Sequence, residues 1–114
     1  MKRFKYALKG ILFALKTQAN IRIHIIISVL VISAGFIFKI NPVEWLFITF
    51  AIGLVLAAEL FNTAIESLVD LVSPDYNEKA GLTKDVAAGA VLIAAVVSVI
   101  IGVIVFLPKI IEII

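Results

Sequence analysis

Three carboxylates and one amide share one face of a predicted helix. They are Glu59, Asn62, Glu66 and Asp70, which together form the acidic stripe. Offsets of 3, 7 and 11 residues from Glu59 span an arc of about 80° at roughly 100° per helical residue. The segment before them is apolar enough to cross a membrane, where ionisable side chains are costly and seldom lack a partner or a function. The acidic stripe is therefore the strongest functional signal in the sequence.

These residue types favour phosphate chemistry. Carboxylate oxygens are ligands that Mg²⁺ prefers, and Mg²⁺ bridges nucleotide phosphates. A single carboxylate can also take a proton from a hydroxyl as a general base. Lys84, followed by Asp85, could neutralise phosphate charge during phosphoryl transfer. The sequence has no glycine-rich loop of the Walker or protein-kinase type, so a kinase site here would differ from the usual nucleotide folds.

Other functions stay open on these residues alone. Glu59 could serve a small proton-coupled transporter, and Asp70 could be a solvated helix end. Transport needs one or two carboxylates near the membrane midplane, which leaves the rest of the acidic stripe and Lys84 unexplained. A non-catalytic membrane subunit is the third interpretation. His24 is expected to be a packed or interfacial side chain, and Arg22 to extend toward lipid headgroups.

Composition narrows the class of protein. The chain has 114 residues, of which 63% are hydrophobic, and its mean hydropathy is +1.20. These values indicate an all-α integral membrane protein with one domain, residues 1–114. The net charge of +2 does not suggest a nucleic-acid partner, and the absence of cysteine excludes a disulfide framework or a thiol nucleophile. No cleavable signal peptide is expected.

Four helices are predicted to position the polar residues. Residues 1–20 form a basic amphipathic helix of the kind that lies on a membrane surface. The predicted spans are residues 21–38, 44–72 and 85–107. Thr83 is the expected cap of the last helix, and Pro108 its expected end. Basic residues concentrate in 1–20 and in the polar loop 73–84, which places the N-terminus and the polar end of the second span in the cytoplasm.

The stretch from Glu59 to Asp70 resembles the signature of the prokaryotic diacylglycerol kinase family. That signature is Glu-x-aliphatic-Asn-Ser/Thr-Ala-aliphatic-Glu-x-x-Val-Asp, and Phe61 stands at the middle aliphatic position. Lys84-Asp85, followed by small residues, resembles the second family marker. The similarity runs over nearly the whole chain. It implies a homotrimer with three membrane helices and a surface helix per subunit, and active sites between subunits at the cytoplasmic face of the bacterial inner membrane.

The resemblance also implies roles for individual residues. Glu59 would be the general base near a lipid hydroxyl, and Glu66 would bind the Mg²⁺ that bridges the phosphates of ATP. Asn62 and Asp70 would support the site. The residues expected to contact or surround the nucleotide are Lys84 and Asp85, with Tyr6, Asp75 and Asn77 as weaker candidates.

Two positions bear on activity and substrate. The family usually has a second metal-binding glutamate at the end of the surface helix, where this chain has Gln18, a weaker Mg²⁺ ligand. Diacylglycerol-preferring members usually carry glutamate where His24 stands. The residues around His24 and the ending 106–109 look like those of Gram-positive-type undecaprenol kinases. The expected reaction is therefore transfer of the ATP γ-phosphate to undecaprenol. The alternatives are a diacylglycerol kinase and a catalytically weakened member.

Overall fold

The structure, a computed structural model, describes residues 2–114 and contains α-helices without strands in that range. The helices are α1 (Lys2–Thr17), α2 (Ala19–Ile37), α3 (Pro42–Val72) and α4 (Glu78–Ile113). The predicted all-α class is confirmed. Met1, which the predicted surface helix includes, lies outside the described residues.

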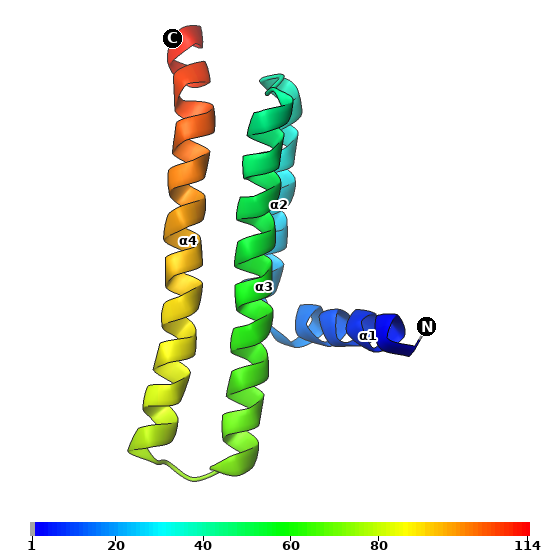
Figure 1. Ribbon diagram of the computed structural model, residues 1–114, viewed down its shortest axis with the longest axis vertical. Coiled ribbons are helices and arrows are strands. Elements are labelled where there is room, and N and C mark those ends of the chain that lie inside the picture. The colour runs from blue at the N-terminus through cyan, green and yellow to red at the C-terminus, as the bar shows by residue number, and fades with distance from the viewer. Residues whose placement is uncertain (1) are drawn as a thin grey trace.

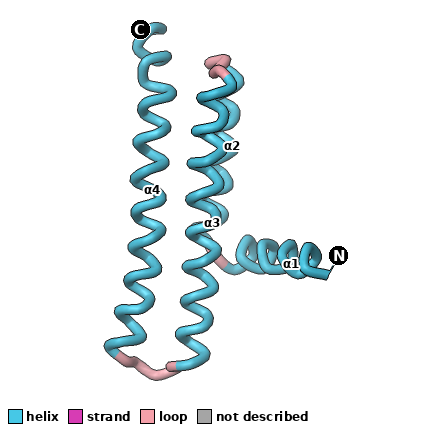
Figure 2. The backbone as a smooth tube through the Cα atoms, viewed as in Figure 1, coloured by secondary structure: helices cyan, strands magenta, loops and turns pink. Residues whose placement is uncertain are grey.

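Helix α1 lies crosswise to the other three helices, which run side by side (Figure 1). Helix α3 returns antiparallel to α2, and α4 runs back along α3. The tube in Figure 2 shows that only short loops join these helices. Each of α2, α3 and α4 is long and apolar enough to cross a membrane, yet only 11%, 22% and 11% of their apolar windows are buried. Their outward faces are therefore suited to contact with lipid.

Several helix limits differ from the sequence expectation. Helix α1 ends at Thr17 rather than near residue 20, because Gln18 has extended backbone angles (φ −112°, ψ 111°). The predicted cap Thr83 is wrong. Asn77 caps α4 instead, accepting hydrogen bonds from the amides of Lys79 and Ala80 at 2.9 and 3.2 Å. The Thr83 hydroxyl lies one turn inside α4 and bonds to the Lys79 carbonyl at 2.9 Å.

Helices α3 and α4 extend beyond the predicted membrane spans 44–72 and 85–107. Helix α3 begins at Pro42, where Asn41 and Glu44 form a capping box with hydrogen bonds of 2.8 and 3.0 Å. Helix α4 continues through Pro108 to Ile113. A proline near a helix end removes one backbone hydrogen bond, which the remaining turns tolerate. These are limits of helices, and the lengths embedded in lipid remain predictions.

The apolar core lies at the end of the bundle where α2 turns into α3. Ile40, Ile48 and Val105 are buried there, and Glu44 accepts a hydrogen bond from Lys109 at 2.9 Å. Gly35 faces Trp45 so closely that an added Cβ would come within 2.6 Å of the indole. This end ties α2, α3 and α4 together.

Arg22 organises the corner between α1 and α2. Its guanidinium donates hydrogen bonds to the carbonyls of Leu15 and Lys16 at 2.9 and 3.0 Å. The expectation that Arg22 extends toward headgroups is wrong, because the last carbonyls of α1 lack helical partners and attract a cation. Ala14 and Ile21 are buried on either side of the corner. The corner therefore fixes the first turn of α2 against α3.

Candidate active site along helix α3

Glu59 is the most deeply buried carboxylate of the acidic stripe. Only 4% of the residue is exposed, and its Oε1 lies 3.2 Å from Nε2 of His24 on α2. The Thr63 hydroxyl donates to the Glu59 backbone carbonyl at 2.9 Å, which leaves the carboxylate unaffected. A buried carboxylate next to a polar donor can act as a general base on a hydroxyl brought to it.

Asn62 and Glu66 form the second polar pair of the stripe. They stand one turn apart on α3, so their side chains are neighbours on the helix surface. The Asn62 amide nitrogen donates to Glu66 Oε1 at 2.6 Å, whereas its Oδ1 is buried without a partner. An unpartnered buried oxygen beside a carboxylate is a site that lacks a donor or a cation. Together these oxygens match the ligand type that Mg²⁺ prefers.

Asp70 and Lys84 connect α3 to α4 at the polar end. The Lys84 ammonium donates to Asp70 Oδ1 at 2.5 Å. This hydrogen bond raises the pKa of Lys84, which precedes the predicted span, and partial desolvation opposes the rise. Lys84 therefore keeps its positive charge at neutral pH. The pair is largely solvent-exposed, so its charges are available to an anionic ligand and contribute little to stability.

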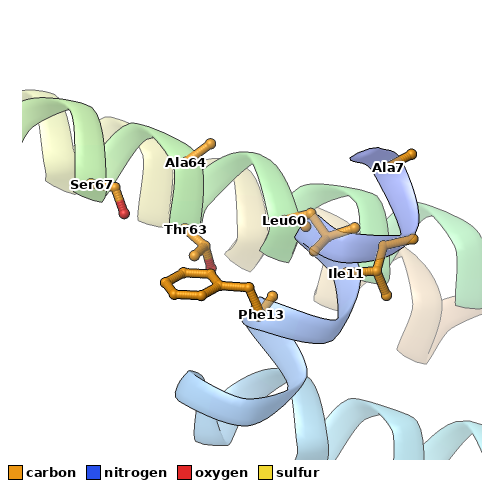
Figure 3. Close-up of a pocket in the computed structure, with 9 residues that line it drawn as sticks. Ala7, Ile11, Phe13, Leu60, Thr63, Ala64 and Ser67 are labelled. Atoms are coloured by element: carbon orange, nitrogen blue, oxygen red, sulfur yellow. The ribbon is translucent and has the colours of Figure 1, made fainter. Parts of the chain in front are cut away.

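An apolar cleft of about 440 Å³ lies between α1 and α3. Figure 3 shows Ile11 and Phe13 on α1 and Leu60 and Thr63 on α3 among its lining residues. Leu60 and Thr63 lie one and four positions after Glu59 along the chain. The cleft opens widely at the surface and presents mainly hydrocarbon. Its size and chemistry suit part of a lipid chain held near the carboxylates.

The remaining predicted site residues are dispersed in the single chain. Tyr6 is 66% exposed on α1, and Asp75 and Asp85 are also exposed. The Asn77 side chain is engaged as the α4 cap. The Gln18 amide reaches only the Thr17 hydroxyl, at 3.5 Å. Within residues 2–114 no cluster of three His, Cys, Asp or Glu side chains could hold a metal ion.

The sequence did not predict the contact between His24 and Glu59. A packed or interfacial histidine was expected, but its ring contacts the Glu59 carboxylate. A signal did exist, because α2 and α3 are antiparallel and joined by a tight turn near Ile40. His24 and Glu59 lie at comparable distances along the chain from that turn, which places them at a similar level in the bundle.

Comparison with known proteins adds independent information. The family model described as prokaryotic diacylglycerol kinase matches residues 5–106. Undecaprenol kinase of Bacillus subtilis (strain 168) is 41% identical over 108 residues, which cover 95% of this chain and 88% of that protein. Diacylglycerol kinase of Synechocystis sp. is 42% identical over 110 residues, 96% of this chain but 63% of that protein. Diacylglycerol kinase of Escherichia coli (strain K12) is 30% identical over 100 residues, 88% of this chain and 82% of that protein.

Proposed function

The chain belongs to the prokaryotic diacylglycerol kinase family, and on that premise we propose that it transfers the γ-phosphate of ATP to the hydroxyl of undecaprenol. The observation that carries the proposal is the buried Glu59 carboxylate, 3.2 Å from the His24 ring, at the polar end of an apolar bundle. The choice of undecaprenol rests on the Bacillus subtilis relative, which this chain matches over nearly the full length of both proteins. Diacylglycerol is the second candidate, because a relative of similar identity is a diacylglycerol kinase.

In the proposed reaction Glu59 takes the proton of the lipid hydroxyl. The hydroxyl oxygen forms a bond to the γ-phosphorus while the bond from that phosphorus to the bridging oxygen of ATP breaks. The products are the lipid phosphate and ADP, and the proton remains on Glu59 until it is released. The cleft between α1 and α3 would hold the hydrocarbon next to the hydroxyl. With a lipid chain bound, its apolar walls would help to keep water, a competing phosphate acceptor, away from the hydroxyl.

The nucleotide is proposed to bind where the acidic stripe leaves the bundle. Glu66 and the unpartnered Oδ1 of Asn62 fit Mg²⁺ by ligand type, and Gln18 would add an amide oxygen. Bound Mg²⁺ would neutralise phosphate charge. Lys84, paired with Asp70, would contribute a fixed positive charge to the phosphates. The other residues proposed near the nucleotide are Asp85, Tyr6, Asp75 and Asn77.

A homotrimer in the bacterial inner membrane is the proposed assembly. The apolar helices leave most of their surface exposed in one chain, and the proposed nucleotide residues of one chain are dispersed. A neighbouring copy would cover part of α4 and complete the site. The distribution of basic residues favours a cytoplasmic N-terminus and a cytoplasmic α3–α4 loop, so that ATP has direct access.

One assay tests the substrate and the reaction together. The protein is purified in detergent and incubated with Mg-ATP and either undecaprenol or diacylglycerol, and the phosphorylated lipid is quantified. We expect product with both lipids and a higher kcat/KM for undecaprenol. A higher value for diacylglycerol would reverse the substrate assignment and leave the kinase assignment intact. Absence of product with either lipid, from a folded oligomeric sample, would contradict the proposed function.

A further inference from the structure

The contact between His24 and Glu59 has a role that the proposed reaction does not yet use. We propose that His24 is a positioning residue: its Nε2–H donates to the Glu59 carboxylate and holds it oriented toward the lipid hydroxyl. The catalytic part of this inference rests on the proposed function. The contact itself does not, since Nε2 and Oε1 are 3.2 Å apart whatever the substrate.

The buried carboxylate of Glu59 requires a hydrogen-bond donor. An ionised carboxylate withdrawn from water is strongly disfavoured unless a hydrogen bond or an opposite charge compensates. The Glu59 side chain is 5% exposed. Within residues 2–114, His24 is the side chain that contacts its carboxylate. His24 therefore supplies the hydrogen bond that a buried carboxylate requires.

Two cations near this end, Arg22 and Lys84, bind groups other than Glu59. Arg22, on the same helix as His24, donates to two carbonyls of α1. Lys84, on α4, pairs with Asp70 near the end of α3. Glu66, the next carboxylate along α3, already receives the Asn62 amide. Arg22, Lys84 and Glu66 thus each have a partner of their own, and the side chain that contacts the Glu59 carboxylate is His24.

The backbone around both side chains is restrained. Ile21, one turn before His24, is buried with 3% exposure, and the Ser28 hydroxyl bonds to the His24 carbonyl at 2.7 Å. The Thr63 hydroxyl bonds to the Glu59 carbonyl. A short, rigid connection between two neighbouring helices suits a group that must hold a carboxylate in one direction. This distinguishes His24 from an exposed histidine whose ring can rotate freely.

Substitution of His24 separates positioning from substrate binding. His24→Leu removes the donor and should lower kcat about 10- to 100-fold, the effect of losing a hydrogen bond to a charged group, with the KM for ATP unchanged. His24→Gln places an amide N–H near the position of Nε2 and should recover most of the loss. Ser33→Ala, which removes from the same helix a hydroxyl bonded to the Val29 carbonyl, is the matched control and should retain normal kcat.

A double-mutant cycle tests whether His24 acts through Glu59. In the Glu59→Gln background, His24→Leu should cause no further loss, because the group that it positions is gone. A second loss of the same size as in the wild-type background would overturn the proposal, as would equal activity of His24→Leu and wild type. A kcat for His24→Gln that is no higher than that of His24→Leu would also overturn the proposal.

A spectroscopic measurement keeps the inference independent of kinase activity. The chain has one histidine, so the ¹⁵N signals of its imidazole in labelled protein are assigned without ambiguity. We expect a proton on Nε2, and a clear change of the Nε2 signal in Glu59→Leu. Identical Nε2 signals in the wild type and in Glu59→Leu would contradict the contact between His24 and Glu59. If the wild type phosphorylates neither lipid, the proposed function fails, and this measurement still decides whether His24 donates to Glu59.

Discussion

Replacement of Glu59 by glutamine changes the charge of the proposed base while preserving its shape. The side chain is buried at 4% exposure, and glutamine has nearly the same volume. Its amide oxygen can still accept the hydrogen bond that Glu59 Oε1 is placed to receive from His24 at 3.2 Å. The substitution therefore removes proton acceptance and leaves the packing of α2 against α3 in place.

The expected loss follows from the role of a general base. Removal of such a group typically costs ~10²–10⁴-fold in rate, or about 2.7–5.4 kcal/mol of transition-state stabilisation at 1.36 kcal/mol per factor of ten. The stability of the protein should not fall, since a neutral amide replaces a carboxylate at a site with little water. The substitution should thus lower the activity without lowering the stability.

The assay measures kcat and KM for the lipid and for ATP, with oligomeric state and thermal unfolding recorded on the same samples. We expect kcat to fall within the stated range, both KM values to change less than threefold as an order-of-magnitude criterion, and the oligomer to persist. A turnover near that of the wild type would remove Glu59 from the base role. Loss of the oligomer would show instead that the carboxylate is needed for assembly.

Three further predictions concern the metal, the nucleotide and the apolar core. Gln18→Glu should lower the Mg²⁺ concentration for half-maximal activity by a modest factor, because the site lies near the surface where the effective dielectric is about 20; an unchanged Mg²⁺ dependence would exclude residue 18 as a ligand. Lys84→Met should lower kcat/KM for ATP roughly 10²-fold with little effect on thermal unfolding, and unchanged ATP kinetics would limit Lys84 to its pairing with Asp70. Gly35→Ala should destabilise the protein by about 1–3 kcal/mol, because the new Cβ would come within 2.6 Å of Trp45. The control is Gly53→Ala, whose added Cβ meets nothing within 4 Å. Equal free energies of unfolding for the two variants would contradict the close packing of Gly35 against Trp45.

The sequence was sufficient for the elements that depend on local patterns. Apolar runs predicted the three long helices, and helical spacing predicted that the acidic stripe occupies one face of α3. The N-terminal limit of α4 was harder to predict from the sequence, since Asn77 and Thr83 are both good capping residues. Asn77 caps α4 because its side chain reaches two amides of the first turn, a choice that depends on the geometry of the loop.

Contacts between helices were beyond the reach of local patterns. Neither the Arg22 contact with α1 nor the His24 contact with Glu59 depends on residues that are neighbours in sequence. Both follow from the angle of the α1–α2 corner and the register of α2 against α3. The roles of Glu66, Gln18 and the nucleotide residues remain predictions, because they concern ligands and a second copy of the chain.

Polar side chains connect neighbouring helices around the proposed site. Arg22 joins α1 to α2, His24 and Glu59 join α2 to α3, and Lys84 and Asp70 join α3 to α4. The apolar core cluster lies toward the opposite end, around Ile48, whereas Ile21 and Val55, each one turn from His24 or Glu59, are also buried. A substitution at the polar end can therefore remove a hydrogen bond between two helices together with a chemical group. The isosteric variant Glu59→Gln keeps the shape of the side chain and so reports on chemistry most directly, whereas the core variant Gly35→Ala reports on stability.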